Sequence, residues 1–257
     1  MQTELRKEIQ AKLKSMKGKP GFFYKNLVTK ESFGYQEDLP FEAASVIKIP
    51  VLIEAFRQME EGKVSTDQGF IIHKEDKLPS CGALTYLHDG ISVTFLDLCV
   101  LMIILSDNTA TNLLIRFLGM ERINQTMREL GVKRTTVNRL LFDAEKAAAG
   151  IENYIVPQEI GMLLEQMENK TLISKEASSR MLEIMKNQRL NGKMPFFVTD
   201  GTKIAHKTGE DDGITHDVGI VYAKEPFIAC FCSNEMDEPM FNRFIQDTTK
   251  KLIEAVK

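Results

Sequence analysis

The order of predicted strands and helices along the chain constrains its fold more than any other feature. Two strand-like segments lie near the N-terminus, at 21–28 and 32–35, and three lie near the C-terminus, at 203–208, 215–223 and 226–233. Apolar or amphipathic segments of helical length occupy both ends of the chain and much of its middle: 1–16, 45–59, 93–105, 109–118, 121–130, 157–169 and 240–256. Strands at both ends with helices between them predict an α+β fold. Its antiparallel sheet is formed by the N- and C-terminal segments and packed with helices, and an all-helical lobe lies beside it.

The chain is long enough, at 257 residues, for two lobes that share one cleft. We place the α/β lobe at about 1–44 and 198–257, and the helical lobe at about 45–197. No repeat, low-complexity segment or linker divides the sequence. We therefore expect a single catalytic domain over 1–257.

Charge and hydropathy narrow the class of partner. A net charge of −3 argues against nucleic acid, whose binding proteins are usually basic. No apolar run is long enough to span a bilayer. The N-terminal segment is charged and lacks the apolar core of a secretory signal, which favours a cytoplasmic protein unless an export leader has been removed. We expect a monomer that acts on a small molecule.

A metal or cofactor is not expected. His73, Cys81 and His88 are the candidate metal ligands, and their spacing matches no zinc pattern.

Three short clusters carry the chemistry: Ser45-Val46-Ile47-Lys48, Ser106-Asp107-Asn108 and Lys207-Thr208-Gly209. A serine hydroxyl is a poor nucleophile at neutral pH and needs a base within hydrogen-bond reach. Lys48, three residues after Ser45, lies on the same face of a helix. A lysine becomes a base only when burial and cationic neighbours lower its pKa well below about 10.4. Lys207 is a candidate for that neighbour, and also for a ligand of an anionic substrate group.

Each cluster taken alone has a simpler interpretation. Ser45 is a possible helix N-cap, 106–108 a turn between two apolar helices, and 207–209 a strand end that enters a hairpin. Together, in this order and with the flanking helix and strand pattern, they favour acyl transfer through a serine ester.

The three clusters resemble those of the penicillin-recognising serine hydrolases, and within them the class A β-lactamases. The resemblance runs from about Phe41 to the C-terminus and is strong over Leu105–Leu114. It implies a groove between the two lobes. There Ser45 is the nucleophile, and the backbone N–H groups of Ser45 and Glu210 form the oxyanion hole.

The same resemblance assigns roles to the remaining cluster residues. Ser106 relays a proton to the leaving nitrogen, and Asn108 orients Lys48 and the substrate amide. Lys207 and Thr208 bind the substrate carboxylate. Gly209 lets the substrate lie against the strand.

One position departs from the class A pattern. Those enzymes carry a glutamate before the 157–169 helix that activates the deacylating water, and alignment on Arg139 puts Leu141 at its place. Leucine cannot accept a proton. Asp143 and Glu145 are candidate substitutes, and the competing interpretation is a solvated loop or a salt bridge to Arg139 or Lys146.

A second position concerns substrate binding. Class A enzymes often place a carboxylate-binding arginine on the strand after Lys-Thr-Gly, and here that place falls near His216. A histidine binds an anion well only when protonated, so anion binding by His216 should weaken above pH ~6.5. The alternative is that His216 pairs with Asp217 or with solvent.

These observations leave three functional hypotheses. The first is a serine hydrolase of β-lactamase type that acts on a β-lactam or a related amide or ester, with slow deacylation because of Leu141. The second is a D-alanyl-D-alanine carboxypeptidase or penicillin-binding protein. The third is a non-catalytic β-lactam-binding sensor domain.

Overall fold

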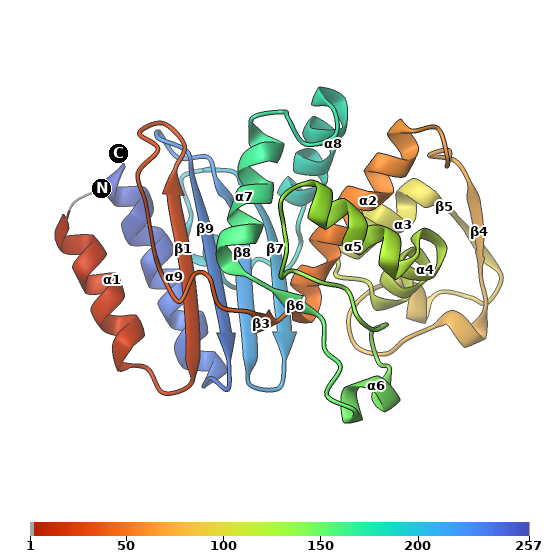
Figure 1. The fold of residues 1–257 in the computed structure, drawn as a ribbon, viewed down its shortest axis with the longest axis horizontal. Coiled ribbons are helices and arrows are strands. Elements are labelled where there is room, and N and C mark those ends of the chain that lie inside the picture. Colours follow the sequence, from red (N-terminus) through yellow and green to blue (C-terminus); the bar gives the residue numbers. More distant parts are fainter. Residues whose placement is uncertain (1–2, 257) are drawn as a thin grey trace.

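A five-stranded antiparallel sheet forms the centre of the fold. The computed structural model describes residues 3–256. The strand order is β2-β1-β9-β8-β7, so strands from the two ends of the chain lie side by side (Figure 1). The bounds are β1 Lys19–Asn26, β2 Ser32–Tyr35, β7 Ile204–Asp211, β8 Ile214–Val221 and β9 Phe227–Asn234. The predicted fold class, with one antiparallel sheet built from both terminal segments, is confirmed.

Side-chain alternation along β1 explains how both faces of the sheet are covered. Phe22 and Tyr24 pack in one core with apolar residues of α1 (Thr3–Ser15) and α9 (Glu238–Ala255). Phe23 points to the opposite face and packs against Gly161 of α7, where a Cβ atom would lie 2.3 Å from Phe23 Cε1. Glycine at this position therefore lets α7 lie close to the sheet.

Helices cover the second face of the sheet and continue into a helical region. α7 contacts β1, β8 and β9, and α8 contacts β7. The predicted helical lobe at about 45–197 therefore includes two helices that pack directly on the sheet. The helices between α1 and α9 are α2 Lys48–Glu60, α3 Phe95–Ile104, α4 Asn108–Leu118, α5 Met120–Glu129, α6 Ala144–Ala148, α7 Pro157–Glu168 and α8 Lys175–Lys186.

Several short elements were not predicted. β3 (Phe41–Glu42) pairs with β6 (Tyr154–Ile155), and β4 (Gly69–Ile72) pairs with β5 (Ile91–Thr94). Pairs of this length bury few residues and give a weak periodic signal in sequence. No helix within residues 3–256 has the length and apolarity that crossing a membrane requires.

The chain around Ser45 differs slightly from a simple helix start. Ala44–Ile47 form a 3-10 helix, and α2 begins at Lys48. The first nine residues of α2, from Lys48 to Phe56, are all buried, so this helix runs through the core. The nucleophile candidate therefore stands on a short turn that a rigid, buried helix anchors.

Candidate active site

The amine of Lys48 brings the first two sequence clusters together. Its Nζ lies 2.8 Å from Ser45 Oγ, 2.9 Å from Ser106 Oγ and 2.9 Å from Asn108 Oδ1. It also donates to the backbone oxygen of Ser106 at 2.7 Å. A base within hydrogen-bond reach of a serine hydroxyl is the geometry that nucleophilic catalysis requires.

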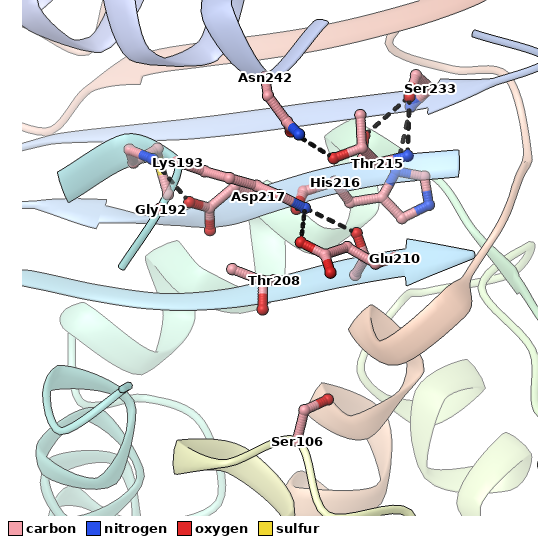
Figure 2. A network of polar contacts seen from close by, with 12 residues as sticks. Ser106, Gly192, Lys193, Thr208, Glu210, Thr215, His216, Asp217, Ser233 and Asn242 are labelled. Atoms are coloured by element: carbon pink, nitrogen blue, oxygen red, sulfur yellow. Dashed lines mark hydrogen bonds and ion pairs between the residues drawn. The ribbon is translucent and has the colours of Figure 1, made fainter. Parts of the chain in front are cut away.

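The third cluster enters from β7. Lys207 Nζ lies 3.1 Å from Ser106 Oγ and donates to the carbonyl oxygen of Thr208 at 2.7 Å. The hydroxyl of Ser106 therefore lies between two amines, one from α2 and one from the sheet. In Figure 2 the hydroxyl of Thr208 points to the side of β7 on which Ser106 lies.

Asp107 holds the Ser106 turn in place. Its carboxylate accepts from the backbone N–H groups of Ala83, Leu84 and Ala110, and the last bond caps α4. Ser106 itself has a φ of 54°, in the left-handed region that non-glycine residues rarely adopt. Such strain persists only where surrounding contacts fix the backbone, and it often marks a functional site.

Burial and charge make both lysines weaker bases than free lysine. Burial first, and then the nearby Lys207 cation, hold the pKa of Lys48 well below its usual value. Burial lowers the pKa of Lys207 to about 7, although the Asp217 carboxylate opposes the shift. This shift favours the neutral amine, the form in which Lys48 can accept a proton.

The cluster opens into a cleft of about 390 Å³. Ser45, Asn108, Leu141 and Glu210 are among its lining residues. The cleft also carries several carboxylates: Glu42, Asp143, Glu152, Glu210 and Asp211. Arg139 is the one lysine or arginine among the described residues that line it, and Arg139 forms an ion pair of 2.6 Å with Glu152. The part of the cleft that these carboxylates line, here called the outer cleft, is therefore acidic.

Gly209 serves a packing purpose that the sequence did not indicate. A Cβ atom there would lie 3.0 Å from His216 Cδ2, 3.2 Å from Val46 Cγ2 and 3.3 Å from Ala44 Cβ. That Gly209 also leaves room for a substrate stays a prediction. Its missing side chain lets β7 lie close to the turn that carries Ser45.

The loop that contains Leu141 is held against α4. Asn112 accepts from the Leu141 backbone N–H and donates to the Leu141 carbonyl, each at 2.9 Å. Arg139 bonds to Glu152 and not to either predicted acid, Asp143 or Glu145. Leu141 therefore lines the cleft in a fixed position.

The two candidate substitutes for the missing glutamate are placed differently. Asp143 lines the cleft, but its Oδ1 accepts from the backbone N–H of Lys146 as the N-cap of α6. Glu145 is exposed on α6 and is not among the cleft-lining residues. Of the two predicted acids, the structure therefore brings only Asp143 to the cleft.

His216 is not available to a substrate. The ring is fully buried, its Nε2 donates to Glu42 O at 2.8 Å, and its Nδ1 accepts from Ser233 N at 3.1 Å. Burial lowers the pKa of His216 to about 4, so the ring is neutral at physiological pH. The prediction that His216 binds a carboxylate is corrected. Asp217 bonds to His206 and to the Met194 N–H, so the alternative pairing of His216 with Asp217 is not found either.

Sequence reasoning missed Lys193 and the role of Asn112. Lys193 is 3% exposed, and its ammonium reaches β7 from a loop that carries no motif. Asn112 lies within the segment that showed the resemblance, but its bonds to Leu141 connect residues 29 apart. No local pattern signals either contact.

Comparisons with known proteins agree with this geometry. The sequence matches the Beta-lactamase enzyme family over residues 4–256. A β-lactamase of Rhodobacter capsulatus is 24% identical over 233 residues, which are 88% of this chain and 79% of that protein. The crystal structure of a β-lactamase from Sphaerobacter thermophilus superposes with a TM-score of 0.92 at 26% identity, covering 100% of this chain and 98% of the other.

A further similar structure is a leucine-to-glutamate variant of PBP-A, determined as an acyl-enzyme complex with penicillin G. It has a TM-score of 0.89 and 27% identity, and it covers 98% of this chain and 96% of the other. The fold, the three clusters and the match over nearly the whole chain establish that this protein belongs to the β-lactamase enzyme family, with a fold like that of the class A enzymes.

Proposed function

We propose that this protein is a serine hydrolase that opens β-lactams through an acyl-enzyme on Ser45 and releases the product slowly. One observation carries the proposal: Lys48 Nζ lies 2.8 Å from Ser45 Oγ and 2.9 Å from Ser106 Oγ. The lowered pKa of the buried Lys48 amine supports it further.

Acylation uses the described groups in a proton-balanced sequence. Neutral Lys48 takes the proton of Ser45 Oγ as the oxygen attacks the lactam carbonyl. The N–H groups of Ser45 and Glu210 stabilise the developing oxyanion. The carbon–nitrogen bond then breaks, and a proton passes from Lys48 through Ser106 to the leaving nitrogen. Asn108 orients Lys48 and the substrate amide, while Lys207 and Thr208 hold the substrate carboxylate.

Deacylation lacks an efficient base. Leu141 occupies the position from which a side chain would activate water, and it has no proton-accepting group. Asp143 is the remaining candidate among the loop acids, although its role as a helix cap competes with this use. The acyl-enzyme is therefore long-lived in this proposal.

A D-alanyl-D-alanine carboxypeptidase is the second candidate. It is favoured by the combination of Leu141 with structural similarity to PBP-A, which was itself studied as a leucine-to-glutamate variant. The third candidate is a β-lactam sensor that stays acylated.

Intact mass spectrometry after mixing with penicillin G tests the proposal. We expect a penicilloyl adduct on the wild type that decays within minutes to hours, and none on Ser45→Ala. Ser80→Ala is the matched control, because Ser80 also lines the cleft but has no place in the proposed machinery. The absence of an adduct on Ser45 would overturn the proposal.

Product analysis separates the three candidates. Slow release of penicilloic acid supports the hydrolase. A stable adduct together with release of D-alanine from an acyl-D-alanyl-D-alanine peptide identifies the carboxypeptidase. A stable adduct without D-alanine release identifies the sensor.

A further inference from the structure

Lys193 lies in a segment that is anchored on both sides. It follows α8, directly before the 3-10 helix Met194–Phe197. Gln246 of α9 donates to the carbonyl oxygen of Gly192 at 2.8 Å, and the backbone N–H of Met194 donates to Asp217 Oδ2 at 2.9 Å. These two bonds fix the backbone around a lysine whose side chain is 4% exposed. Figure 2 shows the side chain extending along β8 toward β7.

The Lys193 ammonium binds backbone oxygens of both strands. Its Nζ donates to Gly209 O and to His216 O, each at 3.0 Å, and lies 3.1 Å from Glu210 Oε1 (Figure 2). Gly209 and His216 are register partners in the β7–β8 ladder. One nitrogen can contact both carbonyls only if they point toward each other across the strand pair. The Gly209 carbonyl therefore points toward β8.

The Gly209 carbonyl belongs to the same peptide group as the Glu210 N–H. In a strand the C=O and N–H of one peptide point in opposite directions, so this N–H points away from β8. β7 is the last strand of the sheet, and Glu210 lines the cleft that contains Ser45. The Lys193 ammonium thus binds the carbonyl oxygen of the peptide group whose N–H, that of Glu210, faces the cleft.

We propose that Lys193 is a positioning residue that polarises the Gly209–Glu210 peptide and so strengthens the Glu210 N–H as an oxyanion donor. The inference rests on the proposed function, in which that N–H stabilises the developing oxyanion. A hydrogen bond from an ammonium draws electron density toward the carbonyl oxygen and makes the N–H of the same peptide a stronger donor.

Two carboxylates favour the charged form of Lys193. Burial lowers the pKa of Lys193, and the charges of Glu210 and then Asp217 oppose that shift. Glu210 thus has two roles in this proposal. Its backbone N–H donates to the oxyanion, and its carboxylate stabilises the Lys193 cation that binds the carbonyl of the same peptide group. The carboxylate also draws part of the ammonium's hydrogen bonding away from Gly209.

The expected size of the effect follows from hydrogen-bond cooperativity. Loss of a whole oxyanion donor slows reaction by about 10²–10³. Polarisation changes the strength of a hydrogen bond by about 10–30%. Applied to the loss of a whole donor, this corresponds to about a two- to eightfold change in the acylation rate constant. Affinity for the substrate before bond formation should not change, because the oxyanion forms only during reaction.

The test combines acylation kinetics with infrared spectroscopy of the acyl-enzyme, formed from penicillin G isotope-labelled at the lactam carbonyl. In Lys193→Met we expect about two- to eightfold slower acylation at unchanged pre-covalent affinity. The ester carbonyl stretch should move as a single band to higher wavenumber. Lys193→Arg keeps the charge and should restore both values. A purely structural role would instead broaden or split the band.

A second variant keeps the test decisive if Lys193→Met does not fold. In Lys193→Gln a neutral amide replaces the ammonium beside the Gly209 carbonyl, so the stretch should again move to higher wavenumber. Two results would overturn this inference alone, provided that wild-type Ser45 forms the adduct. One is an unchanged rate and an unchanged stretch in Lys193→Met, and the other is an unchanged stretch in Lys193→Gln. No adduct on wild-type Ser45 would overturn the proposed function, and this inference with it.

Discussion

Asn112 clamps the backbone of Leu141 through two hydrogen bonds, both 2.9 Å long. The amide side chain of Asn112 satisfies the N–H and the C=O of Leu141 together. The loop is thereby held at the cleft, to which Leu141 contributes an apolar side chain. In the proposed function, deacylation is slow because this side chain cannot take a proton.

Substitution of Leu141 by glutamate should accelerate deacylation. A positioned general base contributes about 10²–10⁴-fold, so we expect Leu141→Glu to shorten the lifetime of the penicilloyl adduct at least about tenfold. Leu141→Gln is the matched control, because it has nearly the same shape and cannot take a proton. Decay of the adduct mass after removal of free penicillin measures the effect. Equal lifetimes in the two variants would show that this position does not control water activation.

Binding of an anionic substrate should weaken as pH rises through the pKa of Lys207, about 7. Below that pH the amine is a cation, and above it the positive charge beside Ser106 is lost. If only the cationic form binds a carboxylate, the apparent Kd rises about tenfold between pH 6 and 8. Calorimetry of penicillin G binding to Ser45→Ala measures this without acylation. The methyl ester of the same penicillin should show little pH dependence, and a flat profile for the acid would contradict the assignment.

His216 should affect stability and not substrate affinity. Its pKa is lowered to about 4 in the folded protein, against about 6.5 when unfolded. The unfolded state then binds more protons between these pH values, so stability falls as pH drops from about 6.5 to 4, by up to about 3 kcal/mol.

Urea unfolding at several pH values tests the role of His216. His216→Gln has no group that titrates in this window and should lose this part of the acid sensitivity. Its affinity for an acidic substrate should match that of the wild type from pH 5.5 to 8. A clear loss of affinity in the variant, at unchanged fold, would restore the idea of a direct substrate contact.

The acidic outer cleft should discriminate between substrate side chains. Burial first, and then the charges of Glu152 and Asp211, raise the pKa of Glu42, so this carboxylate lies in a negative field. A penicillin with an amine in its side chain should acylate Ser45 at least about threefold faster than one with a carboxylate there. The ratio should approach one in 0.5 M salt, because screening removes the field. In the variant Glu42→Gln/Asp211→Asn it should shrink at low salt, and a ratio insensitive to both changes would refute the electrostatic origin.

Much of the site could be predicted from residue types and their spacing. Ser45 and Lys48 are three apart at the start of a buried helix, and local geometry alone brings them together. The strands near both ends of the sequence likewise predict one sheet formed by the N- and C-terminal segments together. These features could be inferred because periodicity and chemical identity are local properties of the sequence.

Other parts of the site depend on packing between distant segments. Alternation along β8 determines the face of the sheet on which His216 lies. Its burial as a neutral ring depends on contacts with Glu42 and Ser233, which are 174 and 17 residues away in the sequence. The position of Lys193 also depends on distant segments, because its contact with the Gly209 carbonyl requires a loop that bonds to α9 and β8. The sequence alone determined which chemical groups the protein has and the order of its strands and helices. Only the tertiary structure decided which groups are desolvated and which peptide each one touches, because burial and hydrogen bonding arise where segments far apart in the chain come together.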